Sequence, residues 1–266
     1  MNILDKIAAC TKERVAEQKA KISLDEMIRL ASAVTLEGFP FEAALRNSED
    51  IAFICEVKKA SPSKGIIAED FPYLQIAQEY QAAGAAAISV LTEPEFFMGS
   101  DAYLREIADG VSTPLLRKDF TVDEYMIYQA KVLGASAVLL ICSILDEDTL
   151  AKYIRIAHSI GLSALVEVHD SAEVAMALGA GARIIGVNNR NLKTFEVDIT
   201  LSEQLRKLVP NDVLFVAESG IKTAAEVEVL RKCGTNAVLI GETIMRSGDK
   251  KAETAKLKGS KGVSYE

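Results

Sequence analysis

A short charged stretch, Glu56–Gly65, combines acid, base and hydroxyl side chains that could do chemistry. It overlaps the end of an apolar run, Ile51–Val57, that is typical of a buried strand. Side chains alternate along a strand, so Glu56 and Lys58 share one face with Ile54. Because a lone buried charge is costly, we expect these two charges to pair with each other or with a ligand.

Further ionisable side chains lie at the ends of other apolar runs. Lys118 shares a strand face with Leu116, and Glu167 shares one with Leu165. If these faces point inward, two lysines and two glutamates meet in one pocket. Opposite charges and burial then move their pKa values in opposing directions, which is how acid and base roles are assigned at one pH.

The last two runs are followed by glycine-containing loops, Ser219-Gly220 and Gly241-Glu242. Backbone amides in such loops form the usual phosphate site of a parallel barrel, and glycine lets the phosphate approach the backbone. Glu218 is ambiguous. Simple alternation points it away from the face of Ser219, yet alternation often breaks where a strand ends.

The elements that must position these groups alternate between strand and helix. Eight apolar runs predict strands at Ile51–Val57, Ala86–Leu91, Pro114–Arg117, Ala137–Ile141, Ala164–Val168, Ile184–Val187, Val213–Ala217 and Ala237–Ile240. Amphipathic segments separate them at Tyr73–Ala83, Ala102–Asp109, Asp123–Leu133, Asp146–Ser159, Ser171–Leu178, Ile199–Leu208 and Thr223–Arg231, with a short last one from Glu242. Repeated strand–helix units imply parallel pairing with right-handed crossovers, and eight of them predict a (β/α)8 TIM barrel of class α/β. A doubly wound sheet is the alternative, but the chain lacks the glycine-rich dinucleotide loop typical of it.

Three regions follow from these patterns. Residues 1–50 predict a helical extension packed on the barrel, since Ile3, Leu4 and Ile7 recur at helical spacing. Residues 51–247 form the barrel. Residues 248–266 are charged and punctuated by glycine, and they predict a flexible tail.

The composition of the chain limits the classes of binding partner and the cellular location that we expect. The net charge of -8 argues against a nucleic-acid partner but not against a phosphorylated small molecule. No apolar run approaches the ~18 residues of a membrane span, and no signal-peptide pattern begins the chain, so the cytoplasm is the expected location. A monomer is the default expectation for the oligomeric state. Four scattered cysteines and two histidines show no ligand spacing, which predicts no disulfide and no metal. His169 could act as an acid or base, but its place beside Asp170 at a predicted helix start does not favour that role.

Several stretches, in order along nearly the whole barrel, resemble the indole-3-glycerol-phosphate synthase family of tryptophan biosynthesis. The matching segments are EVKKASPSKG (56–65), LTEPEFFMGS (91–100), LLRKDFTVDEYMIYQA (115–130), LVEVHD (165–170), IGVNNRNLKTFEVD (185–198), AESGI (217–221) and LIGETIM (239–245). The helical extension before the first strand also resembles that family, where it flanks the barrel mouth. The segment after about residue 248 matches no pattern of it.

The resemblance implies a carboxy-lyase reaction. The substrate would be 1-(2-carboxyphenylamino)-1-deoxyribulose 5-phosphate, whose ring carbon attacks the ketone before CO2 and water leave. No redox step occurs, so the resemblance implies no cofactor.

The resemblance also implies roles for the residues at the strand ends. Lys118 matches the general acid, and Glu167 matches the residue that assists dehydration. Lys58 would lie near the substrate carboxylate and phosphate and could itself act as an acid. Glu56 would orient and tune the lysines, and Asn188 would hydrogen-bond the reacting sugar.

The remaining matched residues would bind the phosphate and the rest of the substrate. Ser219 completes the catalytic set and would hold phosphate together with Gly220, Gly241 and the backbone amide of Glu242. Further substrate contacts are expected at Ser61, Phe97, Arg190 and Glu218.

Three other functions compete with this interpretation. A phosphoribosylanthranilate isomerase would use a cysteine near the first strand end as base, but Cys55 lies on the strand face opposite Glu56. A Schiff-base aldolase would use Lys118 or Lys58 as a nucleophile. A non-catalytic barrel that binds a phosphorylated ligand is expected to have lost polar groups at its strand ends, and here they are present.

Overall fold

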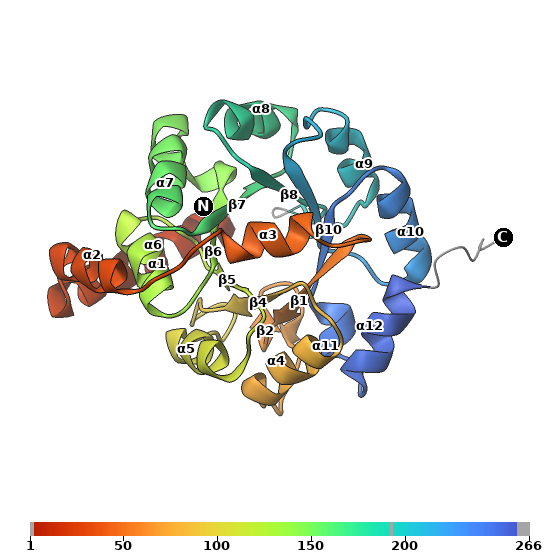
Figure 1. Ribbon diagram of the computed structural model, residues 1–266, viewed down its shortest axis with the longest axis horizontal. Helices are drawn as coiled ribbons and strands as arrows, with labels where there is room; N and C mark the ends of the chain where they lie inside the picture. Colours follow the sequence, from red (N-terminus) through yellow and green to blue (C-terminus); the bar gives the residue numbers. More distant parts are fainter. Residues whose placement is uncertain (1–2, 192–193, 260–266) are drawn as a thin grey trace.

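Eight parallel strands close into a barrel, with helices around its outside (Figure 1). The computed structural model describes residues 3–191 and 194–259. In chain order the barrel strands are β1 (Ala52–Val57), β4 (Ala87–Leu91), β5 (Leu115–Lys118), β6 (Ala137–Ile141), β7 (Ser163–Val168), β8 (Ile184–Asn188), β9 (Leu214–Glu218) and β10 (Ala237–Ile240). β1 pairs with β4 on one side and with β10 on the other, which closes the sheet. The predicted (β/α)8 barrel is confirmed, and each predicted run overlaps one of its strands, with ends that differ by one residue at most.

The outer helices follow the strands as predicted. They are α4 (Tyr73–Ala82), α5 (Asp101–Gly110), α6 (Glu124–Val132), α7 (Glu147–Ser159), α8 (Ser171–Gly179), α9 (Thr200–Arg206), α10 (Ala224–Lys232) and the short α11 (Glu242–Met245). Side chains that accept hydrogen bonds from backbone N–H groups fix several of their first turns. The Asp146 side chain accepts from Thr149 N at the start of α7, and Asp170 accepts from Glu173 N at the start of α8. A 3-10 turn, η1 (Cys142–Ile144), follows β6, and a small antiparallel hairpin of β2 (Ala60–Ser61) and β3 (Gly65–Ile66) follows β1.

Alternation along the strands divides the core into two layers. Inward positions such as Ile54, Leu116 and Leu165 pack together inside the barrel. Outward positions such as Cys55 and Val166 pack between the strands and the helices. Cys55 therefore points away from the barrel interior, as predicted, and burial raises the pKa of its thiol to about 12.

Residues 3–50 contribute three helices that cover both ends of the barrel. α3 (Pro40–Arg46) crosses the end where the strands begin, and its Phe41 and Leu45 are buried in the inner layer (Figure 1). α1 (Ile3–Lys21) reaches the opposite mouth, where Leu4 and Ile7 join the same layer. α2 (Leu24–Ala33) packs on α6.

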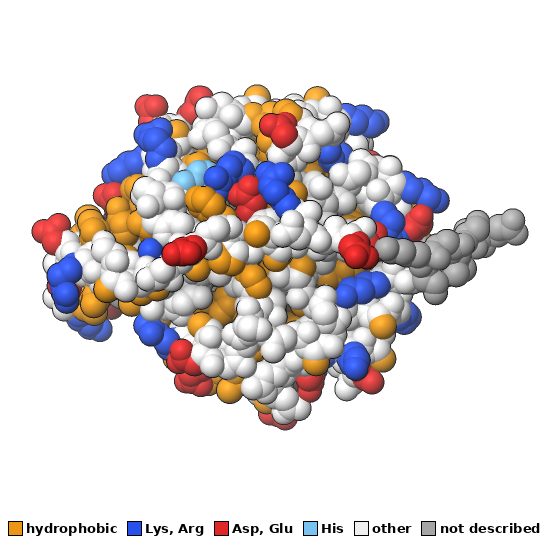
Figure 2. All heavy atoms as spheres, in the orientation of Figure 1, with side chains coloured by type: hydrophobic (Ala, Val, Ile, Leu, Met, Phe, Trp, Pro, Cys, Tyr) orange, Lys and Arg blue, Asp and Glu red, His pale blue; other side chains and the backbone are white. Residues whose placement is uncertain are grey.

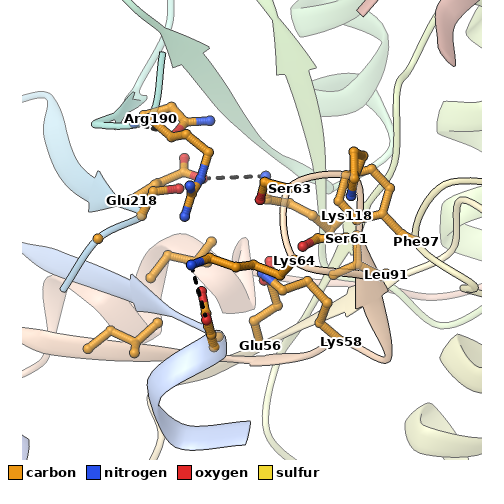
Figure 3. Close-up of a pocket in the computed structure, with 18 of the residues that line it drawn as sticks. Glu56, Lys58, Ser61, Ser63, Lys64, Leu91, Phe97, Lys118, Arg190 and Glu218 are labelled. Carbon is orange, nitrogen blue, oxygen red and sulfur yellow. Dashed lines mark hydrogen bonds and ion pairs between the residues drawn. The ribbon is translucent and has the colours of Figure 1, made fainter. Parts of the chain in front are cut away.

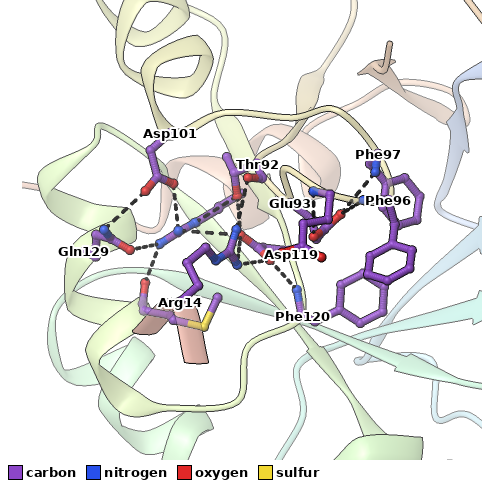
Figure 4. Close-up of polar contacts among 12 residues, drawn as sticks. Arg14, Thr92, Glu93, Phe96, Phe97, Asp101, Asp119, Phe120 and Gln129 are labelled. Atoms are coloured by element: carbon purple, nitrogen blue, oxygen red, sulfur yellow. Dashed lines mark hydrogen bonds and ion pairs between the residues drawn. The ribbon is translucent and has the colours of Figure 1, made fainter. Parts of the chain in front are cut away.

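A buried polar network attaches α1 to the mouth of the barrel (Figure 4). Arg14 of α1 donates to both carboxylate oxygens of Asp119, at 2.8 and 3.0 Å. The Thr92 hydroxyl donates to Asp119 Oδ2 at 2.6 Å, and Arg117 binds Asp101 at 2.8 Å. Each charge thus has an opposite partner, which burial requires. Because Asp119 directly follows β5, this network holds the end of that strand.

The expectation of a flexible tail over residues 248–266 is wrong for its first half. Lys250–Lys258 form a helix, α12, that packs against α4 and α10. Leu257 and Thr254 are fully buried, and Lys258 Nζ donates to the carbonyls of Ala83 and Gly84 at 3.2 and 3.0 Å. The tail was misjudged because most of its residues are charged or polar. Only two side chains of this nine-residue helix are buried, and they are enough to dock it. Residues 260–266 lie outside the described part of the chain.

The outer surface mixes charges of both signs. On the face crossed by α3, basic and acidic side chains are interspersed over the surrounding helices (Figure 2). Within the described ranges, no helix is both long and apolar enough to cross a membrane.

Replacing Leu257 by Ala tests the docking of α12. We expect a loss of about 2–5 kcal/mol in the free energy of unfolding, because truncating a fully buried leucine leaves a cavity in the core layer between the strands and the helices. Urea denaturation measures it. Lys256→Ala, which removes only an exposed ion pair with Glu253, is the control and should change stability by less than about 1 kcal/mol. Equal effects of the two substitutions would mean that α12 is not docked in solution.

Candidate active site

A cavity of about 560 Å³ lies at the mouth of the barrel, where the strands end. Side chains from several strands and from the loop after β1 point into it (Figure 3). It brings together all thirteen residues that the sequence singled out: Glu56, Lys58, Ser61, Phe97, Lys118, Glu167, Asn188, Arg190, Glu218, Ser219, Gly220, Gly241 and Glu242. Their positions follow from strand alternation, because each charged strand residue continues an inward apolar row.

Lys118 lies among carboxylates. Its Nζ is 3.2 Å from Glu167 Oε2 and 3.5 Å from Glu218 Oε2, and its side chain is 15% exposed. Burial alone would lower the pKa of the ammonium, but the charges of Glu167, Glu218 and Glu56 raise it above its ordinary value. Lys118 is therefore held as a cation in the ligand-free protein.

Glu167 and Glu218 share this lysine but differ in proton affinity. Burial favours the neutral form of both. For Glu167, the charge of Lys118, the neighbouring His169 and the hydrogen bond from Asn188 Nδ2, 3.2 Å from Oε1, lower the pKa below its usual value. For Glu218, burial prevails over Lys118 and raises the pKa to about 7. The pair thus combines an ionised carboxylate with one that holds a proton near neutral pH.

The position of Glu218 resolves the ambiguity left by the sequence. Leu214 and Val216 belong to the inner layer, so Glu218 continues an inward row. Ser219 has a φ of 68° and has left the strand, so counting faces from Ser219 points Glu218 the wrong way. Glu218 points into the cavity (Figure 3).

Glu56 and Lys58 pair with each other at the end of β1. Lys58 Nζ is 2.5 Å from Glu56 Oε1, and the Ser89 hydroxyl donates to Glu56 Oε2 at 3.4 Å. The pairing expected of two adjacent buried charges is therefore present. Lys58 is also close to the loop after β10, because a Cβ placed on Gly241 would lie 3.0 Å from its Nζ.

The loops after β9 and β10 lie on the same side of the cavity as Lys58. Gly220 has a φ of 83°, and a Cβ there would lie 2.1 Å from Val197 Cγ1, so only glycine fits. Thr243 donates to the carbonyl of Ile221 at 2.7 Å and joins the two loops. Lys64, which the sequence did not single out, reaches this side and lies 3.8 Å from Glu242.

Arg190 and Phe97 border the cavity from opposite sides. The backbone of Arg190 forms an isolated antiparallel β-bridge with that of Val197. The Arg190 guanidinium donates to the carbonyl of Phe195 at 3.1 Å. Phe97 lies 5.9 Å from the ring of Phe120, and its backbone amide donates to the buried carboxylate of Glu93 at 3.1 Å (Figure 4).

One wall of the cavity is apolar. Ile3, Leu4 and Ile7 of α1 line it with Phe97 and Phe120. The sequence predicted the helix, and the resemblance implied a place beside the barrel mouth, but nothing in the residue pattern indicated that the apolar stripe of the helix faces the cavity. The site therefore offers an apolar surface on one side, a set of acids and bases in the middle and glycine loops on the other side. No group of three or more potential metal ligands occurs in the described parts of the chain.

Known proteins match this chain over almost its full length. The sequence profile of the family described as "Indole-3-glycerol phosphate synthase" matches residues 4–257. A protein of that name from Ruminiclostridium cellulolyticum is 61% identical over 97% of this chain and 99% of its own length. Another from Endomicrobium trichonymphae is 54% identical over 93% and 96%. Among solved structures, a chain of the tryptophan synthase complex from Pyrococcus furiosus matches in fold, with a TM-score of 0.58 and 13% identity. The match covers 79% of this chain and 99% of the tryptophan synthase chain. The extent and identity of the sequence matches lead to one conclusion: this chain belongs to the indole-3-glycerol phosphate synthase family.

Proposed function

We propose that this protein is an indole-3-glycerol phosphate synthase. It would convert 1-(2-carboxyphenylamino)-1-deoxyribulose 5-phosphate to indole-3-glycerol phosphate by ring closure, loss of CO2 and loss of water. The observation that carries the proposal is the arrangement of Lys118 between Glu167 and Glu218, in a cavity with an apolar wall on one side.

In ring closure, the ring carbon that bears the carboxylate attacks the ketone, and the carbonyl oxygen must take up a proton. Lys118 is suited to donate it, because nearby carboxylates hold it as a cation. Loss of CO2 then restores the aromatic ring. Lys58, paired with Glu56, is suited to lie near both the carboxylate and the phosphate of the substrate. It is also the second candidate for the general acid.

In dehydration, the new hydroxyl leaves as water and a carbon next to it loses a proton. Glu167 is suited to accept that proton, because its pKa is lowered and its two oxygens are oriented by Lys118 and Asn188. Glu218 would supply or hold a proton at the same place. Asn188 would also hydrogen-bond the sugar.

The phosphate would bind on the side of the glycine loops. Ser219 and Gly220 after β9, and Gly241 and the backbone amide of Glu242 after β10, would donate hydrogen bonds to it. Ser61 and Arg190 would contact the remainder of the substrate, and Phe97 would stack on its aromatic ring.

Two competing activities fit the geometry less well. A Schiff-base lysine must be neutral to attack, whereas the pKa of Lys118 is raised. An isomerase base at Cys55 would point away from the cavity, into the layer between strands and helices. We further propose a monomer that acts in the cytoplasm without a cofactor; analytical ultracentrifugation tests the first of these.

The direct test is to incubate the protein with the carboxyphenylamino-ribulose phosphate and follow indole fluorescence. Lys118→Ala and Glu167→Gln should each lower kcat by about 10²–10⁴-fold, because each removes a positioned proton donor or acceptor. Affinity for a non-reactive phosphorylated analogue should change little. Lys256→Ala, on the surface, is the matched control. Near-normal turnover in either site variant would refute its assigned role.

Gly220→Ala tests the phosphate side. The added methyl group would collide with Val197 and distort the loop, so we expect KM to rise about tenfold or more through lost charge-assisted hydrogen bonds. Gly248→Ala is the matched control, since a Cβ there meets open space. An unchanged KM in Gly220→Ala would show that this loop does not hold the phosphate.

Glu218 gives a prediction for stability against pH. Its pKa is about 7 in the folded protein against an ordinary 4.5, so the folded state binds the proton more tightly and stability falls as pH rises between these values. Between pH 5 and pH 8 the wild type should lose about 1–3 kcal/mol relative to Glu218→Gln, measured by urea unfolding at both pH values. Parallel pH dependences of the two proteins would contradict this.

A further inference from the structure

We propose that His169 is a positioning residue for Glu167: the ring is held from behind by Glu173 and Ser143, and it directs Nε2 at the Glu167 carboxylate as a cation. The proposal rests on the proposed role of Glu167. His169 lies at the junction of β7 and α8 and is not among the described residues that line the cavity. It would therefore act through Glu167 and not on the substrate.

The far side of the ring is fixed by acceptors. His169 Nδ1 lies 3.2 Å from Glu173 Oε2 and 3.2 Å from Ser143 Oγ. The Ser143 hydroxyl donates its proton to Glu173 Oε1 at 2.7 Å, so it offers Nδ1 only lone pairs. Glu173 Oε2 also accepts from the His169 backbone amide at 2.7 Å, which fixes the carboxylate beside the ring. Nδ1 must therefore carry a hydrogen.

The near side of the ring faces the active site. Nε2 lies 3.5 Å from Glu167 Oε1, is shielded from solvent and makes no hydrogen bond within the described residues. A neutral ring with its hydrogen on Nδ1 would turn a lone pair of Nε2 toward a carboxylate oxygen. A second proton, on Nε2, replaces this repulsion by a charge-assisted contact. The geometry thus favours the imidazolium.

The charges around the ring agree with this geometry. Burial lowers the pKa of His169, but Glu173 of α8, Glu167 of β7 and Glu218 of β9 raise it above its ordinary value. Glu167 would then lie between two cations, Lys118 at Oε2 and His169 near Oε1. Both favour its ionised form, which a base requires.

The alternative is that His169 only supports the start of α8. Asp170 caps that helix, and the bond from the His169 backbone amide to Glu173 needs no imidazole. Two measurements separate these possibilities, and one of them does not depend on catalysis.

The first measurement is an NMR titration of the imidazole groups in the ligand-free protein. The chain has only two histidines, so His158→Gln and His169→Gln assign the signals. We expect His169 to titrate above the ordinary value of about 6.5. His158, whose pKa is lowered by burial and by Arg183, should titrate below it. Glu167→Gln should lower the midpoint of His169. A His169 midpoint that does not respond to Glu167→Gln would overturn the proposal, even if the protein proves to be inactive as a synthase.

The second measurement is the pH profile of turnover in His169→Gln. Glutamine can still donate a hydrogen bond but carries no charge, so the pKa of Glu167 should rise and the acidic limb of kcat should move upward by about one pH unit. KM should change little. His158→Gln, near the other end of the barrel, is the matched control and should leave the profile unchanged. A wild-type profile in His169→Gln would overturn the proposal, whereas absence of activity in the wild type would instead refute the proposed function.

Discussion

The site depends on one buried interaction, the contact of the Lys118 ammonium with the carboxylates of Glu167 and Glu218. A lysine inside the mouth of a barrel is costly unless anions surround it, and two adjacent carboxylates are costly unless a cation separates them. The three groups therefore require one another. Their arrangement also distributes the protons, with Lys118 charged, Glu167 ionised and Glu218 holding a proton near neutral pH.

The rest of the molecule keeps this cluster largely buried and fixed. The barrel delivers the three side chains from β5, β7 and β9, and inward apolar rows beneath them close the core. The Arg14–Asp119 pair ties α1 to the residue next to Lys118, while Ile3, Leu4 and Ile7 of the same helix form the apolar wall. A substrate with an aromatic ring, a reacting centre and a phosphate would find an apolar surface, an acid–base cluster and glycine loops in that order.

Much of this arrangement could be predicted from the sequence, for a definite physical reason. Alternation in β1, β5 and β7 is regular, so placing Ile54, Leu116 and Leu165 inside also placed Glu56, Lys118 and Glu167 inside. The predictions from local sequence patterns failed where tertiary contacts or an irregular backbone decide the structure. α12 was missed because Thr254 and Leu257 are its only buried residues among many charges. Glu218 stayed ambiguous because the positive φ of Ser219 cannot be read from residue types. The roles of Lys64, which crosses from the first loop to Glu242, and of the α1 wall depend on loop paths that no periodicity encodes.

Lys118 and Glu167 are proposed to work as one unit. A double-mutant cycle on kcat with Lys118→Ala, Glu167→Gln and the double variant tests it most directly. If the two groups depend on each other, the double variant should lose about as much activity as the more damaged single variant. Losses that multiply, so that each substitution has the same effect in the presence and absence of the other, would contradict the account.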